Sequence, residues 1–145
     1  MPTIEEYLLN LEGKLNATEV RAGFFEGATY PDGTSVPEVA AKNEYGDPAN
    51  NQPPRPFFRN AIAENMGEWR DGIVRGLRAG VDAENVLEAV GGVIVGDIQK
   101  SISTLMEPVL SAYTIKRRKE RGNSSTKPLV DTRVMITSVN YEVIK

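Results

Sequence analysis

A proline-rich segment at residues 46–56 constrains the fold of this chain more than any other stretch. Its sequence, GDPANNQPPRP, contains four prolines in eleven residues. Each proline fixes φ at roughly −65° and lacks a backbone donor, so the segment cannot be a regular helix or an inner strand. We therefore expect an extended, semi-rigid arm, which would span about 34 Å in a polyproline conformation.

Two short helices are predicted before this arm. The first covers residues 3–12, with Thr3 as its N-cap. Its apolar residues recur at helical spacing, namely Ile4, Tyr7, Leu8 and Leu11. The second helix begins after Ser35, which forms a capping-box pattern with Glu38, and it ends at Gly46.

Two long helices are predicted after the arm. The first begins at about Phe57 and ends at Gly80, and the second begins after the cap Asp82 and continues to about residue 106. Five apolar residues on the first helix form a stripe that we expect to be buried in the core: Ile62, Met66, Trp69, Ile73 and Leu77. Interior glycines are costly in a helix, so we expect another helix to pack closely against those of the second helix: Gly91, Gly92 and Gly96.

Strands are predicted near both ends of the sequence. Alternating apolar residues mark them at Val20, Ala22 and Phe24, and again at Val139, Tyr141 and Val143. Before the last strand, Asp131 or Thr132 is expected to cap one further helical turn. The order of elements predicts a single α+β domain over residues 1–145. In it, the first and last strands form a small antiparallel sheet, packed against two long amphipathic helices plus short helices.

The composition argues against an enzyme. The chain of 145 residues has no cysteine and no histidine, so it lacks a thiol nucleophile, the usual general base and the commonest metal ligand. Its carboxylates show no ligand or acid–base spacing, and the glycine cluster GGVIVG lacks a phosphate-loop pattern. We therefore expect no catalytic residue, no metal site and no cofactor. The sequence also resembles neither a secretory signal nor a membrane span, so no membrane partner is expected.

The strongest local charge is a basic run on a predicted short helix. Its cations are Lys116, Arg117, Arg118, Lys119 and Arg121. They could contact a phosphate backbone or an acidic protein, or they could form the solvated face of the helix. The net charge of the whole chain is −3, so nothing global indicates a nucleic-acid binder.

Several segments of the chain resemble one family of phage proteins. They are VRAGFFEGATYPDGTSVPEVAAKNEYGDP at 20–48, PPRPFFRNAI at 53–62, KPLVDT at 127–132 and SVNYEV at 138–143. Together they resemble the tail-completion or neck proteins of tailed bacteriophages and prophages, also called tail-to-head joining proteins. That family commonly has glycine after the last Asp-Thr pair, where this chain has Arg133. We therefore expect the helix-to-strand corner at residues 133–136 to be built differently.

The resemblance implies a structural virion protein with an α+β fold and no catalytic residues. Family members form a ring at the junction of the head connector and the tail tube, and DNA passes through the ring. The implied partners are other copies of the chain (a hexamer, or alternatively a dodecamer), a head-side connector or head-completion protein, and a tail terminator or tail tube protein. The implied location is the virion neck, after assembly in the cytoplasm of the bacterial host. The alternative is a DNA-contacting accessory protein that uses the basic helix 116–121.

We expect the subunit interface of such a ring at the proline-rich arm. Prolines restrict the free chain, so less entropy is lost when the arm is fixed against a neighbour. The expected interface residues are Pro53, Pro54, Arg55, Pro56, Phe57 and Phe58. Because Phe57 and Phe58 are adjacent on a helix, we expect one of them in the core and the other at the interface.

Overall fold

The computed structural model describes residues 3–106 and 127–145, except for the side chains of residues 106 and 127–132. Its elements, in chain order, are α1 (Ile4–Lys14), β1 (Glu19–Phe24), α2 (Val36–Tyr45), the 3-10 turn η1 (Pro48–Asn50), α3 (Phe57–Arg78), α4 (Ala83–Met106), α6 (Lys127–Ser138) and β2 (Val139–Ile144). The helix starts predicted from Thr3, Ser35 and Asp82 are confirmed. The side chains of Thr3, Ser35 and Asp82 accept hydrogen bonds from the first turns of α1, α2 and α4, respectively.

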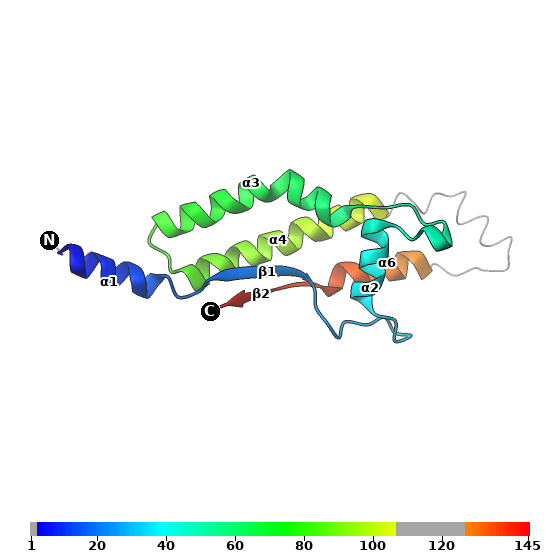
Figure 1. Ribbon diagram of the computed structural model, residues 1–145, viewed down its shortest axis with the longest axis horizontal. Coiled ribbons are helices and arrows are strands. Elements are labelled where there is room, and N and C mark those ends of the chain that lie inside the picture. Colours follow the sequence, from blue (N-terminus) through cyan, green and yellow to red (C-terminus); the bar gives the residue numbers. More distant parts are fainter. Residues whose placement is uncertain (1–2, 107–126) are drawn as a thin grey trace.

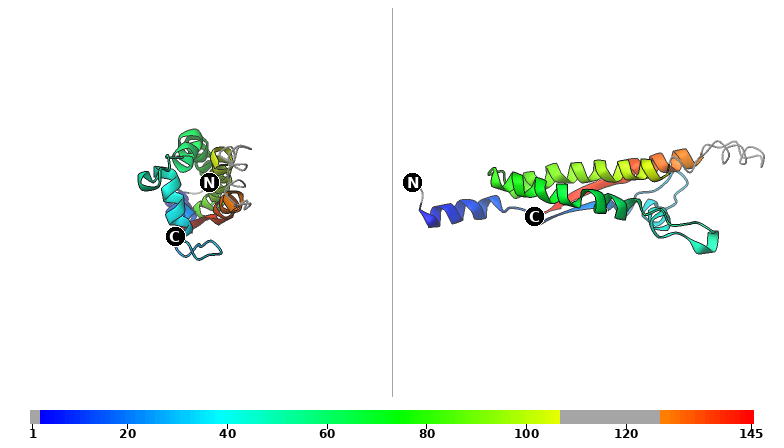
Figure 2. Two further views of the ribbon diagram at one scale, coloured as in Figure 1. Left: turned by 90° about the vertical axis from the view of Figure 1, so that its right-hand side faces the viewer. Right: turned by 90° about the horizontal axis from the view of Figure 1, so that it is seen from above.

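The molecule is elongated, and α4 forms its central layer (Figure 1). α3 lies along one side of α4, and the two-stranded sheet packs along another. α1 projects beyond one end of the molecule, whereas α2 and α6 lie at the other end (Figure 2). The predicted α+β fold, with a sheet of the first and last strands, two long helices and short helices, is confirmed; of the two long helices, α4 makes the main contact with the sheet.

The sheet joins the first predicted strand to the last. β1 and β2 pair antiparallel, with Glu19 opposite Ile144 and Phe24 opposite Val139. The main core lies where α2 and α6 meet α3, α4 and this sheet. Its buried residues are Tyr30, Val36, Ala40, Phe57, Ala61, Ile98, Ile102, Met135 and Val139. Full burial of each large apolar side chain contributes about 1.5–3 kcal/mol, so this core is a major source of stability.

The contact between α3 and α4 depends on small residues, and the predicted buried stripe of α3 is wrong. A Cβ atom on Gly76 would lie 2.7 Å from Val86 Cγ2, so the two helices approach closely there. In contrast, Met66 is 46 % exposed and Leu77 is 38 % exposed. The other stripe residues, Ile62, Trp69 and Ile73, are half-buried. Hydrophobic periodicity failed because the contacting face carries glycine and alanine, which permit close approach but add little hydrophobicity.

The glycines of α4 divide into two kinds. A Cβ atom on Gly91 would lie within 3 Å of three ring carbons of Tyr141 on β2, so the predicted close contact exists at that position, but its partner is the sheet and not another helix as predicted. Within the described residues, nothing lies within 4 Å of a Cβ built on Gly92 or Gly96, so the prediction is wrong for both. The close approach is therefore between a helix and the sheet.

The cap predicted at Asp131 or Thr132 is also wrong. α6 begins at Lys127 and continues through both residues to Ser138, and β2 follows at Val139 without a loop. Pro128 lies in the first turn of α6, where the missing N–H costs nothing because that turn has free N–H groups anyway. The corner at residues 133–136 is helical, and it contributes the buried Met135 to the core.

The predicted basic helix lies outside the described residues, so its role as a contact for DNA or for a partner stays a prediction. Across residues 3–106 and 127–145, no helix is long and apolar enough to cross a bilayer. In the same part of the chain, no group of acidic side chains is arranged to hold a metal ion.

Candidate interaction site

The segment at residues 46–56 is a folded loop in its first half, so the prediction of an extended arm is wrong there. η1 forms one 3-10 turn, and Asp47 bridges back to Gln52 through two backbone hydrogen bonds, of 2.9 and 3.0 Å. Asn51 has φ of 53°, a left-handed conformation that asparagine tolerates better than most residues. Polar turn residues outweigh the stiffness of Pro48, which lies at the start of η1 and loses no helical hydrogen bond.

Asn43 on α2 holds this loop against the body of the protein. Its backbone carbonyl accepts from Arg55 N at 2.6 Å, and its side-chain oxygen accepts from Gln52 Nε2 at 2.9 Å. Gly46, with φ of 81°, lets the chain turn; a Cβ there would lie 3.0 Å from Gln52 O and Pro54 N. The N-E-Y-G element at 43–46 and the proline element therefore form one interlocked unit.

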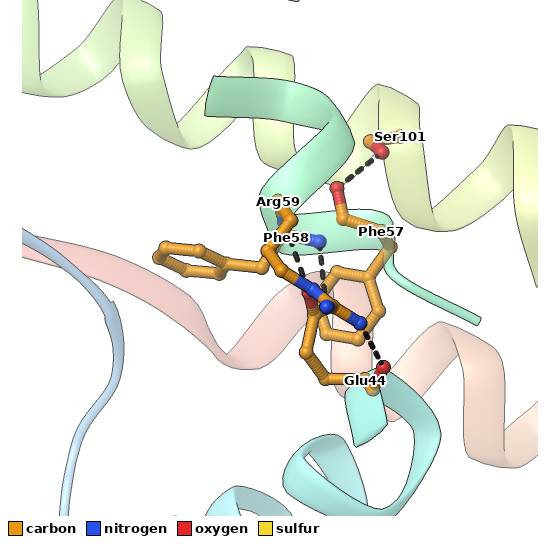
Figure 3. A network of polar contacts seen from close by, with 5 residues as sticks. All are labelled: Glu44, Phe57, Phe58, Arg59 and Ser101. Carbon is orange, nitrogen blue, oxygen red and sulfur yellow. Dashed lines mark hydrogen bonds and ion pairs between the residues drawn. The ribbon is translucent and has the colours of Figure 1, made fainter. Parts of the chain in front are cut away.

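Glu44 is the buried residue that connects α2 to the start of α3. Pro56 supplies no side-chain cap for α3, and the Glu44 carboxylate takes that role from another helix. It accepts from Phe58 N at 2.8 Å and from Arg59 N at 3.0 Å, as Figure 3 shows. The Arg59 guanidinium adds a 2.9 Å ion pair to the carboxylate and donates to the Glu44 carbonyl. A carboxylate at a helix N-terminus also interacts favourably with the helix dipole.

The two phenylalanines that follow the prolines have different environments. Phe57 is 1 % exposed and lies edge-on to Phe24, with ring centroids 6.0 Å apart. Its carbonyl accepts a 2.6 Å hydrogen bond from Ser101 Oγ on α4. Phe58 is half-buried, and its ring lies 3.5 Å from a Cβ built on Gly23. The predicted place of one phenylalanine in the core is confirmed for Phe57, whereas an interface role for Phe58 stays a prediction.

An apolar groove of about 430 Å³ lies beside this junction, between α2, α3 and β1. Its lining includes Phe24, Ala40, Ala41, Tyr45, Phe58 and Ile62, with Pro37 and Phe57. Arg59 forms part of the rim, where its guanidinium lies 5.2 Å from the centre of the Tyr45 ring. Tyr45 is 69 % exposed although it is aromatic. The volume and the lining suit small apolar groups, including apolar side chains.

The other predicted interface residues lie on the same loop. Pro53 and Pro54 are exposed, and Arg55 and Pro56 are half-buried. Among the described residues, no carboxylate forms an ion pair with Arg55. These residues are placed at the surface next to the α2–α3 junction, and their contact with a second subunit stays a prediction.

α1 is a second candidate surface, at the opposite end of the molecule. No residue of α1 is buried, and its apolar stripe is exposed to between 40 and 74 %. Asn16 fixes the root of the helix: its side chain donates to Asp82 at 3.0 Å and accepts from Glu84 N at 2.8 Å. The hydrogen bonds from Asn16 and Asn85 hold the pKa of the Asp82 carboxyl below its ordinary value.

A polar contact also links the sheet to α4 near this end. The Tyr141 hydroxyl donates to Glu88 at 2.7 Å, and this bond raises the pKa of Tyr141. Tyr141 and Glu88 therefore form a structural link between the sheet and α4.

Sequence reasoning missed Asn43 and Glu44, which hold the site together. Both are polar residues on a helix, where the default expectation is exposure, yet they are 6 % and 5 % exposed. The one available signal was α3 itself, since a helix that starts after Pro56 without a side-chain cap requires an acceptor from elsewhere.

No family model, no curated protein and no solved structure matches this chain. The resemblance to phage neck proteins therefore rests on the segments quoted above.

Proposed function

We propose that the chain is a structural virion protein of a tailed bacteriophage or prophage, and that it forms a homo-oligomeric ring at the head–tail junction. In this role it joins the tail to the head, and DNA passes through the ring. The proposal rests on the resemblance of the quoted segments. It is supported by the finding that parts of two of these segments, NEYG at 43–46 and PPRPFF at 53–58, pack against each other as one unit.

The structural observation that supports self-association is the exposed apolar stripe of α1. An isolated helix of eleven residues is marginal in water, and large exposed apolar patches on soluble proteins mark interaction sites. α1 is nevertheless well capped and fixed at its root by Asn16. A helix of this kind is suited to contact with another subunit.

Further partners follow from the same proposal. The ring contacts itself, a head-side connector or head-completion protein, and a tail terminator or tail tube protein. Its contact with packaged DNA is non-specific proximity. The protein acts through its surfaces and carries out no catalysis.

Native mass spectrometry and negative-stain images of the purified protein test this role. We expect a closed ring, with a hexamer as the first expectation. A chain that stays monomeric at every concentration, with or without a head or tail partner, would contradict the proposal. Steeply salt-dependent binding of duplex DNA by a monomer would favour the accessory DNA-binding role instead.

A further inference from the structure

The apolar stripe of α1 has no cover within its own subunit. Ile4 is 74 % exposed and Leu8 is 54 % exposed, and Tyr7 and Leu11 lie on the same side of the helix. Among the described residues, only the root of α1 is attached to the body, through Asn16. The helix therefore projects in a defined direction with its leucines in solvent.

The apolar groove beside the α2–α3 junction offers a surface that could receive such an apolar stripe. It is lined by aromatic and aliphatic side chains, and Ile62 on its wall is followed one turn later by the exposed Met66. The cation of Arg59 lies at its rim, with 56 % of the side chain exposed. The one carboxylate of the lining, Glu44, is already satisfied by the first turn of α3.

The two features lie at opposite ends of an elongated molecule (Figures 1 and 2). α1 points away from the body, so it cannot fold back onto the groove of its own subunit while Asn16 holds its root. A second copy placed end to end brings one α1 to the next groove. The arrangement therefore favours contact of α1 with the groove of another copy over contact with the groove of its own subunit.

We infer that α1 of one subunit docks, with its apolar stripe, in the α2–α3 groove of the next copy of the same chain. The eleven residues of α1 form a rod of about 16 Å, short enough to lie across one end of a neighbour. Charge does not oppose the contact: α1 carries Glu5, Glu6 and Glu12 against one lysine, and the one carboxylate of the groove, Glu44, is already paired with Arg59.

This contact deepens the proposed ring and rests on it. The two contacting surfaces, α1 and the groove, are different, so the interface is heterologous. Each subunit inserts its α1 into the groove of one neighbour and binds the α1 of the other neighbour in its own groove. Such an interface closes into a ring when the rotation between subunits allows it, and otherwise it propagates. It also explains why Tyr45 and Phe58, at the groove, remain partly exposed in a single subunit.

Cysteine cross-linking tests the contact directly, because the chain has no cysteine of its own. Full-length chains with Leu8→Cys are mixed with chains with Ala41→Cys, which lies in the groove, and are treated with a short bismaleimide. We expect a cross-linked pair in the mixture. The control replaces Ala41→Cys with Ala89→Cys, an exposed position on α4, and should give about a tenth of the yield or less. Equal yields, or efficient cross-linking of Leu8→Cys chains alone, would overturn the inference.

Substitution on the stripe supplies the second test. Leu8→Asp should raise the dissociation constant of self-association about 100-fold, whereas Asn10→Asp, outside the stripe, should change it less than about threefold. Circular dichroism should show the same folded body in both, since α1 buries nothing in its own subunit. An intact ring in Leu8→Asp overturns this inference and leaves the proposed function standing. A wild-type chain that never assembles overturns the proposed function itself.

Discussion

α1 and the α2–α3 junction represent two different ways of holding a helix. α1 follows the local rules: Thr3 caps it in a full capping box with Glu6, and acidic residues occupy its first turn. Even so, it buries no residue. α3 breaks a local rule, since Pro56 gives it no side-chain cap, but it begins at Phe57, one of the most buried side chains of the protein.

The contrast between α1 and α3 shows that the residues that set a helix boundary need not be those that stabilise the fold. Local capping decides the boundaries of α1, whereas contacts between distant segments decide the energy of the junction. Glu44 caps α3 from α2, and Ser101 on α4 donates to the Phe57 carbonyl. Substitutions at the junction should therefore affect global unfolding, and those on α1 should affect assembly.

The largest effect is expected at Phe57. Phe57→Ala should lower the free energy of unfolding by about 3–5 kcal/mol, because the ring is fully buried and its removal leaves a cavity. Phe58→Ala should cost less than half as much, since Phe58 is half-buried. Urea unfolding of both variants measures the two values. Equal losses would show that the groove side of α3 is as important for the fold as the core side.

The cap that α2 provides to α3 should come next. Glu44→Gln should cost about 1.5–3 kcal/mol, because hydrogen bonds to a buried carboxylate are replaced by an amide that cannot accept all of them. Glu38→Gln is the matched control on the same helix, where an exposed pair with Lys42 at 3.9 Å should contribute less than about 0.5 kcal/mol. Thermal melts of both proteins give the comparison, and similar melting temperatures would refute a capping role.

Replacing glycines of α4 by alanine should destabilise the protein at one position and stabilise it at another. Gly91→Ala should destabilise the protein by about 1–3 kcal/mol, since the new methyl group would overlap the Tyr141 ring. Gly92→Ala, at an open position, should instead stabilise the helix by about 0.5–1 kcal/mol. Opposite signs in denaturant unfolding are the expected result. The same sign at both positions would mean that α4 and the sheet are not packed as described.

The smallest effect on global stability should come from the cap of α1. Thr3→Ala removes a cap that contributes about 1 kcal/mol to its helix, yet the free energy of unfolding of the monomer should stay within about 0.5 kcal/mol of the wild-type value. Hydrogen exchange should show faster exchange in α1 amides alone. If Thr3→Ala lowered the free energy of unfolding as much as Glu44→Gln, α1 would unfold together with the rest of the protein. The proposed difference between α1 and the α2–α3 junction would then be wrong.

The parts of the fold that sequence predicts well depend on short-range signals. Thr3, Ser35 and Asp82 each precede a helix and bond to its first turn, so their neighbours in sequence suffice to identify them. The strands at both ends alternate in character, and a chain with two such strands has few ways to form a sheet. With only two predicted strands, the pairing of β1 with β2 is the simplest sheet that the sequence allows.

The parts that sequence predicts poorly depend on shape and on distant partners. Gly76 fits against Val86 because it is small, and a hydrophobicity pattern gives no weight to that. Glu44 is buried only because α3 starts beside it, some fourteen residues later. In the proline-rich segment, the prolines predicted an extended arm, but the bridge between Asp47 and Gln52 shows that the polar turn residues around Pro48 fold its first half into a loop.

The pairing of Glu19 with Ile144 sets an order of events for folding. On the ribosome, β1 is synthesised before α2, α3, α4 and α6, so its edge stays without its partner until β2 has emerged. α3 and α4 are neighbours in sequence, and they can pack early at a small cost in loop-closure entropy. We expect the sheet to close last, which makes the final residues of β2 the step that completes the fold.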